Sequence, residues 1–65
     1  MKISINGVAK DVTSINLAAI LHEVGYSDAR VATAVNGHFI PVGQRESCPI
    51  EAGDQVEIVA PRQGG

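Results

Sequence analysis

Hydrophobic and polar residues alternate at the start of the chain. Residues 2–6 read Lys-Ile-Ser-Ile-Asn, which places Ile3 and Ile5 on one side of an extended segment. A period of two is typical of a strand with one buried face. Asn6-Gly7 follows, and both residue types tolerate the positive φ of a tight hairpin turn. Residues 8–12 alternate again, so we expect them to return as the second strand of a hairpin.

The spacing of apolar residues changes from two to helical after residue 13. The apolar positions at i, i+3, i+4 and i+7 are Leu17, Ile20, Leu21 and Val24. This stripe predicts an amphipathic helix over residues 17–24. Ser14 or Asn16 can cap its first turn, because each has a side-chain oxygen that accepts backbone N–H groups. Gly25 stands just past the end, where a left-handed residue is favoured.

Extended segments dominate the rest of the chain. Residues 31–36 are expected to form a strand, and Asn36-Gly37 repeats the turn signal before a short strand over residues 38–40. Residues 42–50 show no period and are expected to be irregular.

The last alternating segment covers residues 55–59. Its period places Val56 and Ile58 on the inward side. We therefore expect one domain over residues 1–60, followed by a flexible C-terminal tail over residues 61–65.

The predicted order is strand, strand, helix, strand, short strand, strand. One amphipathic helix needs an apolar sheet face to cover it, which gives a two-layer α+β domain. The order fits a β-grasp, in which a mixed sheet of about four to five strands packs on one helix. An unrelated α+β sandwich stays open, since periodicity does not determine strand order.

Length and composition narrow the function classes. The chain has 65 residues, of which 45% are hydrophobic and 18% charged, as in ordinary globular domains. A chain this short supports one small core and hardly an enclosed pocket of about 300 Å³. A self-contained enzyme is therefore disfavoured.

Charge and cysteine content disfavour several partners. Five Lys and Arg against seven Asp and Glu give a net charge of −2, and the basic residues are scattered, which disfavours nucleic acid. No stretch approaches the ~20 apolar residues of a membrane span, and the alternating start does not resemble a signal peptide. Cys48 has no second cysteine, and one thiol with the distant His22 and His38 is no zinc site. We expect a cytoplasmic protein without a bound metal or cofactor.

The sequence closes on two glycines, Gly64-Gly65. A backbone without side chains can enter a narrow slot and bring its carboxylate beside a reactive group. The alternative is that these glycines are an ordinary chain end.

Several segments together carry a family resemblance: residues 2–7, 17–24, 34–37, 39–41, 51–59 and the terminal Gly64-Gly65. Over nearly its whole length the chain resembles the ThiS family, the small sulfur carriers of thiamine thiazole biosynthesis. The resemblance implies a ubiquitin-like β-grasp fold and no catalytic residues in the carrier itself.

The resemblance also implies a modification site and partners. An E1-like adenylating enzyme (ThiF-type) would consume ATP to adenylate the terminal carboxylate, which maps onto Gly65. Sulfur from a cysteine desulfurase or another donor would then give a thiocarboxylate, and thiazole synthase (ThiG-type) would take that sulfur. Gly64, Gln63 and Arg62 would be recognised as the tail. Arg62-Gln63 stand where close relatives often have smaller or apolar residues, which leaves the particular activating partner open.

Two apolar residues are candidates for partner docking. Val59 is out of phase with the inward side of its strand, so exposure is favoured. For Phe39, docking on a partner and completion of the core are both open. Cys48, His22 and His38 have no visible partner residue, and we expect them to be packed or solvated and not reactive.

Two alternative functions stay open. A sulfur carrier of another pathway, such as molybdopterin or cysteine synthesis, would share the fold and the Gly65 chemistry. A β-grasp binding module without terminal chemistry, comparable to TGS domains, would bind RNA or nucleotide regardless of Gly64-Gly65.

Overall fold

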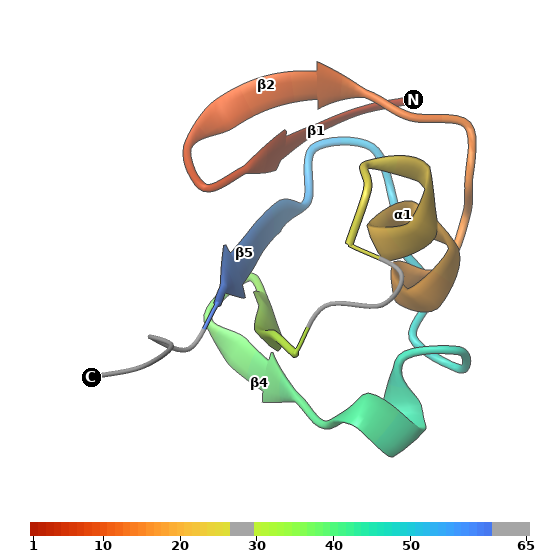
Figure 1. Ribbon diagram of the computed structural model, residues 1–65. Coiled ribbons are helices and arrows are strands. Elements are labelled where there is room, and N and C mark those ends of the chain that lie inside the picture. Colours follow the sequence, from red (N-terminus) through yellow and green to blue (C-terminus); the bar gives the residue numbers. More distant parts are fainter. Residues whose placement is uncertain (27–29, 61–65) are drawn as a thin grey trace.

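The structure, a computed structural model, describes residues 1–26 and 30–60 (Figure 1). Its elements in chain order are β1 (Lys2–Ile5), β2 (Val8–Asp11), α1 (Leu17–Glu23), β3 (Ala32–Val35), β4 (His38–Ile40), the 3₁₀ turn η1 (Val42–Gln44) and β5 (Gln55–Val59). The predicted order of strands and helix is confirmed, and the predicted boundaries differ from the observed ones by at most one residue. The predicted tail over residues 61–65 lies outside the described residues.

The five strands form one mixed sheet in the order β2-β1-β5-β3-β4. The central pair, β1 and β5, is parallel, and the other three pairs are antiparallel. All three strands that follow the helix in the sequence therefore lie on the same side of β1, as a β-grasp requires. In Figure 1, β5 runs between the β1–β2 hairpin and the β3–β4 hairpin.

Both hairpins turn at Asn-Gly, as predicted. Asn6 and Gly7 have φ of 51° and 82°, and Asn36 and Gly37 have φ of 50° and 83°. Positive φ at both central residues is the type I′ geometry, whose twist matches that of the flanking strands. The turn chemistry therefore determines the register of each hairpin.

The helix begins with a side-chain cap. Of the two candidates, Asn16 is the cap: its Oδ1 accepts the Ala19 N–H at 2.8 Å. Leu17, Ile20 and Leu21 are buried against the sheet, and Val24 is half-buried. The helix has only seven residues, so its stability depends on this packing.

The core lies between α1 and one face of the sheet. Its buried apolar residues are Ile3, Val12, Leu17, Ile20, Leu21, Val35, Ile50, Val56 and Ile58. Val56 and Ile58 thus point inward, as the period of β5 predicted. Ile50 comes from the segment predicted to be irregular, which still contributes to the core.

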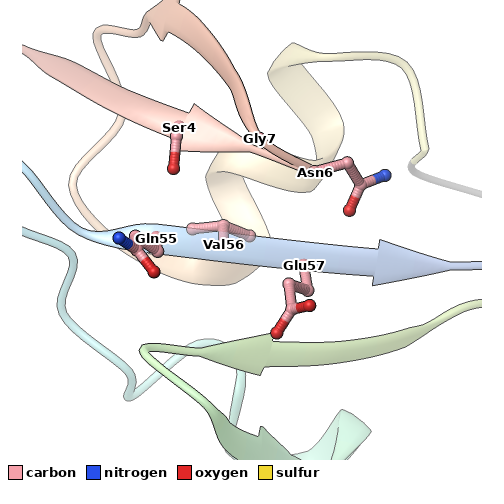
Figure 2. A pocket seen from close by; sticks show the side chains of 6 residues that line it. All are labelled: Ser4, Asn6, Gly7, Gln55, Val56 and Glu57. Atoms are coloured by element: carbon pink, nitrogen blue, oxygen red, sulfur yellow. The ribbon is translucent and has the colours of Figure 1, made fainter.

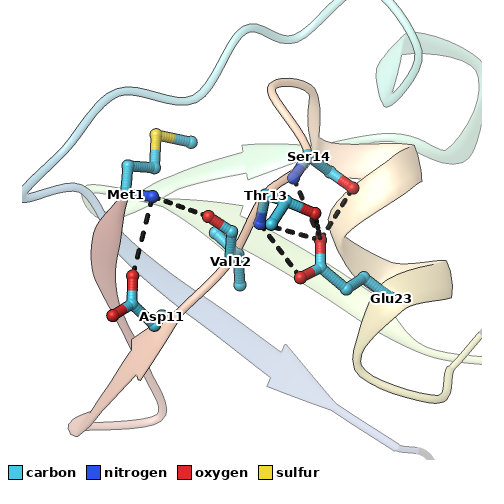
Figure 3. Close-up of polar contacts among 6 residues, drawn as sticks. All are labelled: Met1, Asp11, Val12, Thr13, Ser14 and Glu23. Atoms are coloured by element: carbon cyan, nitrogen blue, oxygen red, sulfur yellow. Dashed lines mark hydrogen bonds and ion pairs between the residues drawn. The ribbon is translucent and has the colours of Figure 1, made fainter.

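The start of the β2–α1 connection is held by the last residue of the helix (Figure 3). The Glu23 carboxylate accepts hydrogen bonds from the Thr13 and Ser14 N–H groups, at 3.0 to 3.1 Å, and from the Ser14 hydroxyl at 2.8 Å. The Ser14 hydroxyl and the two backbone N–H groups lower the pKa of Glu23. Figure 3 also shows the Met1 amine donating to the Val12 carbonyl at 2.6 Å.

Candidate functional site

The face of the sheet opposite the helix carries both predicted docking residues. Phe39 is 67% exposed and Val59 is 63% exposed. The exposure expected of Val59 is confirmed, and of the two alternatives for Phe39 the structure has the exposed one. The docking role of both residues stays a prediction.

Strand register explains why these two residues share a face. Phe39 on β4 is paired with Ala34, and Val59 on β5 is paired with Ala32. Ala34 lies between the buried residues Thr33 and Val35, and neighbouring side chains on a strand point to opposite faces. Ala32, Ala34 and their cross-strand partners therefore point away from the helix.

These four residues form an apolar patch, which we define as Ala32, Ala34, Phe39 and Val59. Together with Thr33 and Glu57 they line a hollow of about 150 Å³. Val59 on β5 and Phe39 on β4 flank the two small alanines, because β3 lies between these strands. An exposed apolar patch with a charged neighbour is typical of a surface that binds another protein.

The patch lies beside the start of the predicted tail. Val59 is the last residue of β5, and only Ala60 separates it from residues 61–65. The predicted modification site Gly65 and the predicted recognition residues Gly64, Gln63 and Arg62 lie outside the described residues.

The turn asparagines hold β5 at two points, a role that sequence reasoning missed. Asn36 Oδ1 accepts the Gln55 N–H at 2.9 Å, where β5 begins. Asn6 Oδ1 accepts the Ile58 N–H at 2.8 Å, and its Nδ2 donates to the Ile58 carbonyl at 3.0 Å, near the end of β5. The Asn-Gly pattern identified both residues only as turn formers, because side-chain bonds across 52 residues for Asn6 and 19 residues for Asn36 leave no local signal.

A second hollow follows the boundary between β1 and β5. It has a volume of about 470 Å³, and its lining residues are Ser4, Asn6, Gly7, Gln55, Val56 and Glu57. Figure 2 shows Asn6 at the end of β1, beside the part of β5 that follows Val56. The hollow thus lies over the segment that leads to the end of β5.

The remaining candidate residues are not brought together. His22 and His38 are exposed, and Cys48 is half-buried against the core. Over residues 1–26 and 30–60, no three His, Cys, Asp or Glu side chains are grouped to hold a metal ion. In the same part of the chain, no helix is both long enough and apolar enough to cross a membrane.

A mixed sheet with a parallel central pair, covered on one face by a single helix, defines a ubiquitin-like β-grasp domain. The family model of the ThiS family matches residues 3–65, so the chain belongs to the ThiS family. The family is one of small sulfur carrier proteins, not catalysts, and membership supports a sulfur carrier role.

Two solved structures share the fold. A crystal structure of the thiamine biosynthesis protein ThiS from Geobacter metallireducens is 23% identical, with a TM-score of 0.84 and full coverage of both chains. A solution structure of a thiamine biosynthesis protein from the same organism is 22% identical, with a TM-score of 0.81, and covers 100% of this chain and 88% of the other. No curated protein matches the chain significantly.

Proposed function

We propose that this protein carries sulfur as a thiocarboxylate on Gly65 and donates it for the thiazole ring of thiamine. The observation that supports the proposal most directly is the ThiS family match, which extends to residue 65 and so includes the terminal Gly64-Gly65. The carrier performs no catalysis; enzymes act on its terminus.

The chemistry explains why an activating enzyme is needed. A carboxylate is a poor electrophile, because its charge repels nucleophiles and oxide is a poor leaving group. An E1-like adenylating enzyme (ThiF-type) joins the carboxylate to AMP and releases pyrophosphate from ATP. The terminal sulfur of a persulfide, formed by a cysteine desulfurase or another donor, then attacks the acyl carbon and displaces AMP. A thiol then attacks the donor's sulfur in the resulting S–S bond, so that a disulfide forms between the thiol and the donor and the thiocarboxylate on Gly65 is released as the leaving group.

A tethered thiocarboxylate has an advantage over free sulfide. Sulfur on a protein is delivered where the protein docks, which raises its effective concentration at thiazole synthase (ThiG-type). In this proposal, the apolar patch docks on the activating enzyme while Arg62, Gln63 and Gly64 enter its active-site channel. The closeness of Val59 to residue 61 in the chain supports this division. We place these reactions in the cytoplasm.

Intact mass spectrometry tests the proposal. The protein is incubated with a ThiF-type enzyme, ATP, a persulfide donor and a thiol, and we expect a gain equal to the exchange of one oxygen for sulfur. A variant lacking Gly65 and a variant with one residue added after it are the controls, and neither should gain mass. Sulfur loading of the extended variant would show that the free Gly65 carboxylate is not the site.

The acceptor is tested separately. Addition of a ThiG-type synthase with its other substrates should return the carrier to its original mass as the thiazole forms. A charged carrier that this synthase cannot discharge would assign the protein to another sulfur pathway.

A further inference from the structure

We propose that Asn6 is a positioning residue for sulfur loading, because its side-chain amide holds the end of β5 from which the chain runs to Gly65. The inference rests on the proposed function, since it concerns delivery of the Gly65 carboxylate to the activating enzyme.

The first step of the argument is the hydrogen-bond ladder between β1 and β5. The parallel pairing of these strands ends at Ile5 and Val56, and the Asn6 N–H donates to the Val56 carbonyl at 2.9 Å. The backbone then turns away at Asn6, whose φ is 51°. β5 continues for three more residues, to Val59.

The side chain of Asn6 continues the ladder after its backbone has left. A primary amide offers an acceptor and a donor in one plane, as a peptide group does. Its Oδ1 accepts the Ile58 N–H at 2.8 Å and its Nδ2 donates to the Ile58 carbonyl at 3.0 Å. Asn6 thus supplies the acceptor and the donor that backbone groups of a longer β1 would have supplied. Figure 2 shows its side chain at the end of β1, beside β5.

With these two bonds the end of β5 is hydrogen-bonded on both of its edges, and without them on the β3 edge only. On the other side, β3 pairs with β5 as far as Ala32 and Val59. Without the Asn6 amide, the Ile58 backbone would lose both partners on the β1 side. The end of a strand that is paired on one side only opens more often.

Opening at Ile58 would affect delivery of the tail and leave docking intact. Of the four patch residues, three lie on β3 and β4, and the bonds of Asn6 reach none of them. The fourth, Val59, is paired with Ala32 on the β3 side, a pairing that does not involve Asn6. The patch should therefore bind the activating enzyme as before. The Gly65 carboxylate would reach the reactive position in a smaller fraction of docked complexes, and reaction rates depend steeply on such positioning.

Asn36 provides a matched control. It occupies the same place in the second Asn-Gly turn, with a φ of 50°, and its Oδ1 also accepts a β5 N–H. Its bond lies at Gln55, the end of β5 that is far from the tail. Glycine accepts positive φ without strain, so Asn6→Gly and Asn36→Gly each remove a side-chain amide and keep the turn.

Steady-state sulfur loading by a ThiF-type enzyme, ATP, a persulfide donor and a thiol compares the wild-type chain with both variants. We expect Asn6→Gly to lower kcat about five- to tenfold while KM stays within about twofold, because a lost positioning contact acts after binding. Asn36→Gly should keep the wild-type kcat. Asn6→Asp keeps an acceptor for the Ile58 N–H but places a carboxylate oxygen against the Ile58 carbonyl, where the Nδ2 donor stood, so it should also lower kcat.

Amide hydrogen exchange gives a readout that is independent of the enzyme. The Ile58 amide should exchange faster in Asn6→Gly than in Asn36→Gly, while amides of the core strands keep their protection. A wild-type kcat in Asn6→Gly, or an equal loss of kcat in both glycine variants, would overturn the positioning role. Failure of the wild-type chain to be loaded would instead overturn the proposed function, and the positioning role with it.

Discussion

Arg45 joins the 41–50 segment to β3, and its replacement tests how that segment is held. Its Nε donates to the Thr33 hydroxyl at 3.0 Å, and its Nη2 donates to the Val31 carbonyl at 2.6 Å. Thr33 is the buried polar residue of the core, 1% exposed, and its hydroxyl donates in turn to the Ile40 carbonyl at 2.9 Å. One half-buried guanidinium thus connects three parts of the chain.

Arg45→Met keeps most of the aliphatic side chain and removes both hydrogen bonds. Hydrogen bonds to charged groups contribute about 1.5–3 kcal/mol each, but the Val31 carbonyl is half-buried and can regain water. We therefore expect Arg45→Met to lower the free energy of unfolding by about 2–3 kcal/mol. For a domain of this size, that loss is a large fraction of the total stability.

A double-mutant cycle isolates the Arg45–Thr33 bond. Thr33→Val is close to isosteric and removes the hydroxyl, which leaves the Arg45 Nε without its partner, at a cost of about 1–2 kcal/mol. Groups in one hydrogen-bond network couple by about 0.5–3 kcal/mol. The free energy of unfolding of the double variant should therefore fall by clearly less than the sum of the decreases in the two single variants. Urea unfolding followed by circular dichroism gives the four free energies.

The control is Lys10→Met, a substitution at an exposed position of β2, where surface changes stay within about 0.5 kcal/mol. If Arg45→Met lowered the free energy of unfolding no more than this control, the two Arg45 hydrogen bonds would not stabilise the fold. Strict additivity of Arg45→Met and Thr33→Val would show that their bond contributes nothing measurable.

Two other substitutions test the patch and the Glu23 contact. Phe39→Ala should raise KM for sulfur loading several-fold and leave the free energy of unfolding unchanged. The control is Val42→Ala, at a 73% exposed position outside the patch, which should keep the wild-type KM. Equal KM values in the two variants would show that Phe39 is not a docking residue. Because the pKa of Glu23 is lowered in the folded chain, its contribution to stability is present above the ordinary glutamate pKa of about 4.5 and is lost as pH falls through the folded value. The free energy of unfolding, measured at pH values from about 7 to about 3, should therefore fall less steeply with acid in Glu23→Gln than in wild type. Identical pH curves for the two proteins would contradict a stabilising role of the Glu23 carboxylate.

Local interactions explain what the sequence could predict. The Asn6-Gly7 and Asn36-Gly37 turns and the helix over residues 17–24 depend on neighbours within a few positions, and all three form where expected. The exposure of Phe39 is also a feature that the sequence can predict. A two-residue turn at Asn36-Gly37 pairs Phe39 with Ala34, and Ala34 is out of phase with the inward Thr33 and Val35.

Other features depend on contacts that no local pattern encodes. The segment over residues 42–50 has no period, yet Ile50 is buried and its N–H donates to the Ile15 carbonyl at 2.9 Å. From the sequence alone, Arg45 would be taken for an exposed charge, because no nearby residue indicates its hydrogen bonds. Its partners Thr33 and Val31 are 12 and 14 residues away. Strand order was open for the same reason.

The position of β5 connects the fold to the proposed carrier function. β5 is the last strand in the sequence and the central strand of the sheet, paired with β1 on one side and β3 on the other. A parallel pair needs a long crossover connection, and the connection from β1 to β5 contains β2, the helix and the β3–β4 hairpin. The patch likewise combines Phe39 from β4 with Val59 from β5. The patch and the held end of β5 therefore both depend on the assembled sheet, which brings the proposed docking surface and the start of the tail to one strand.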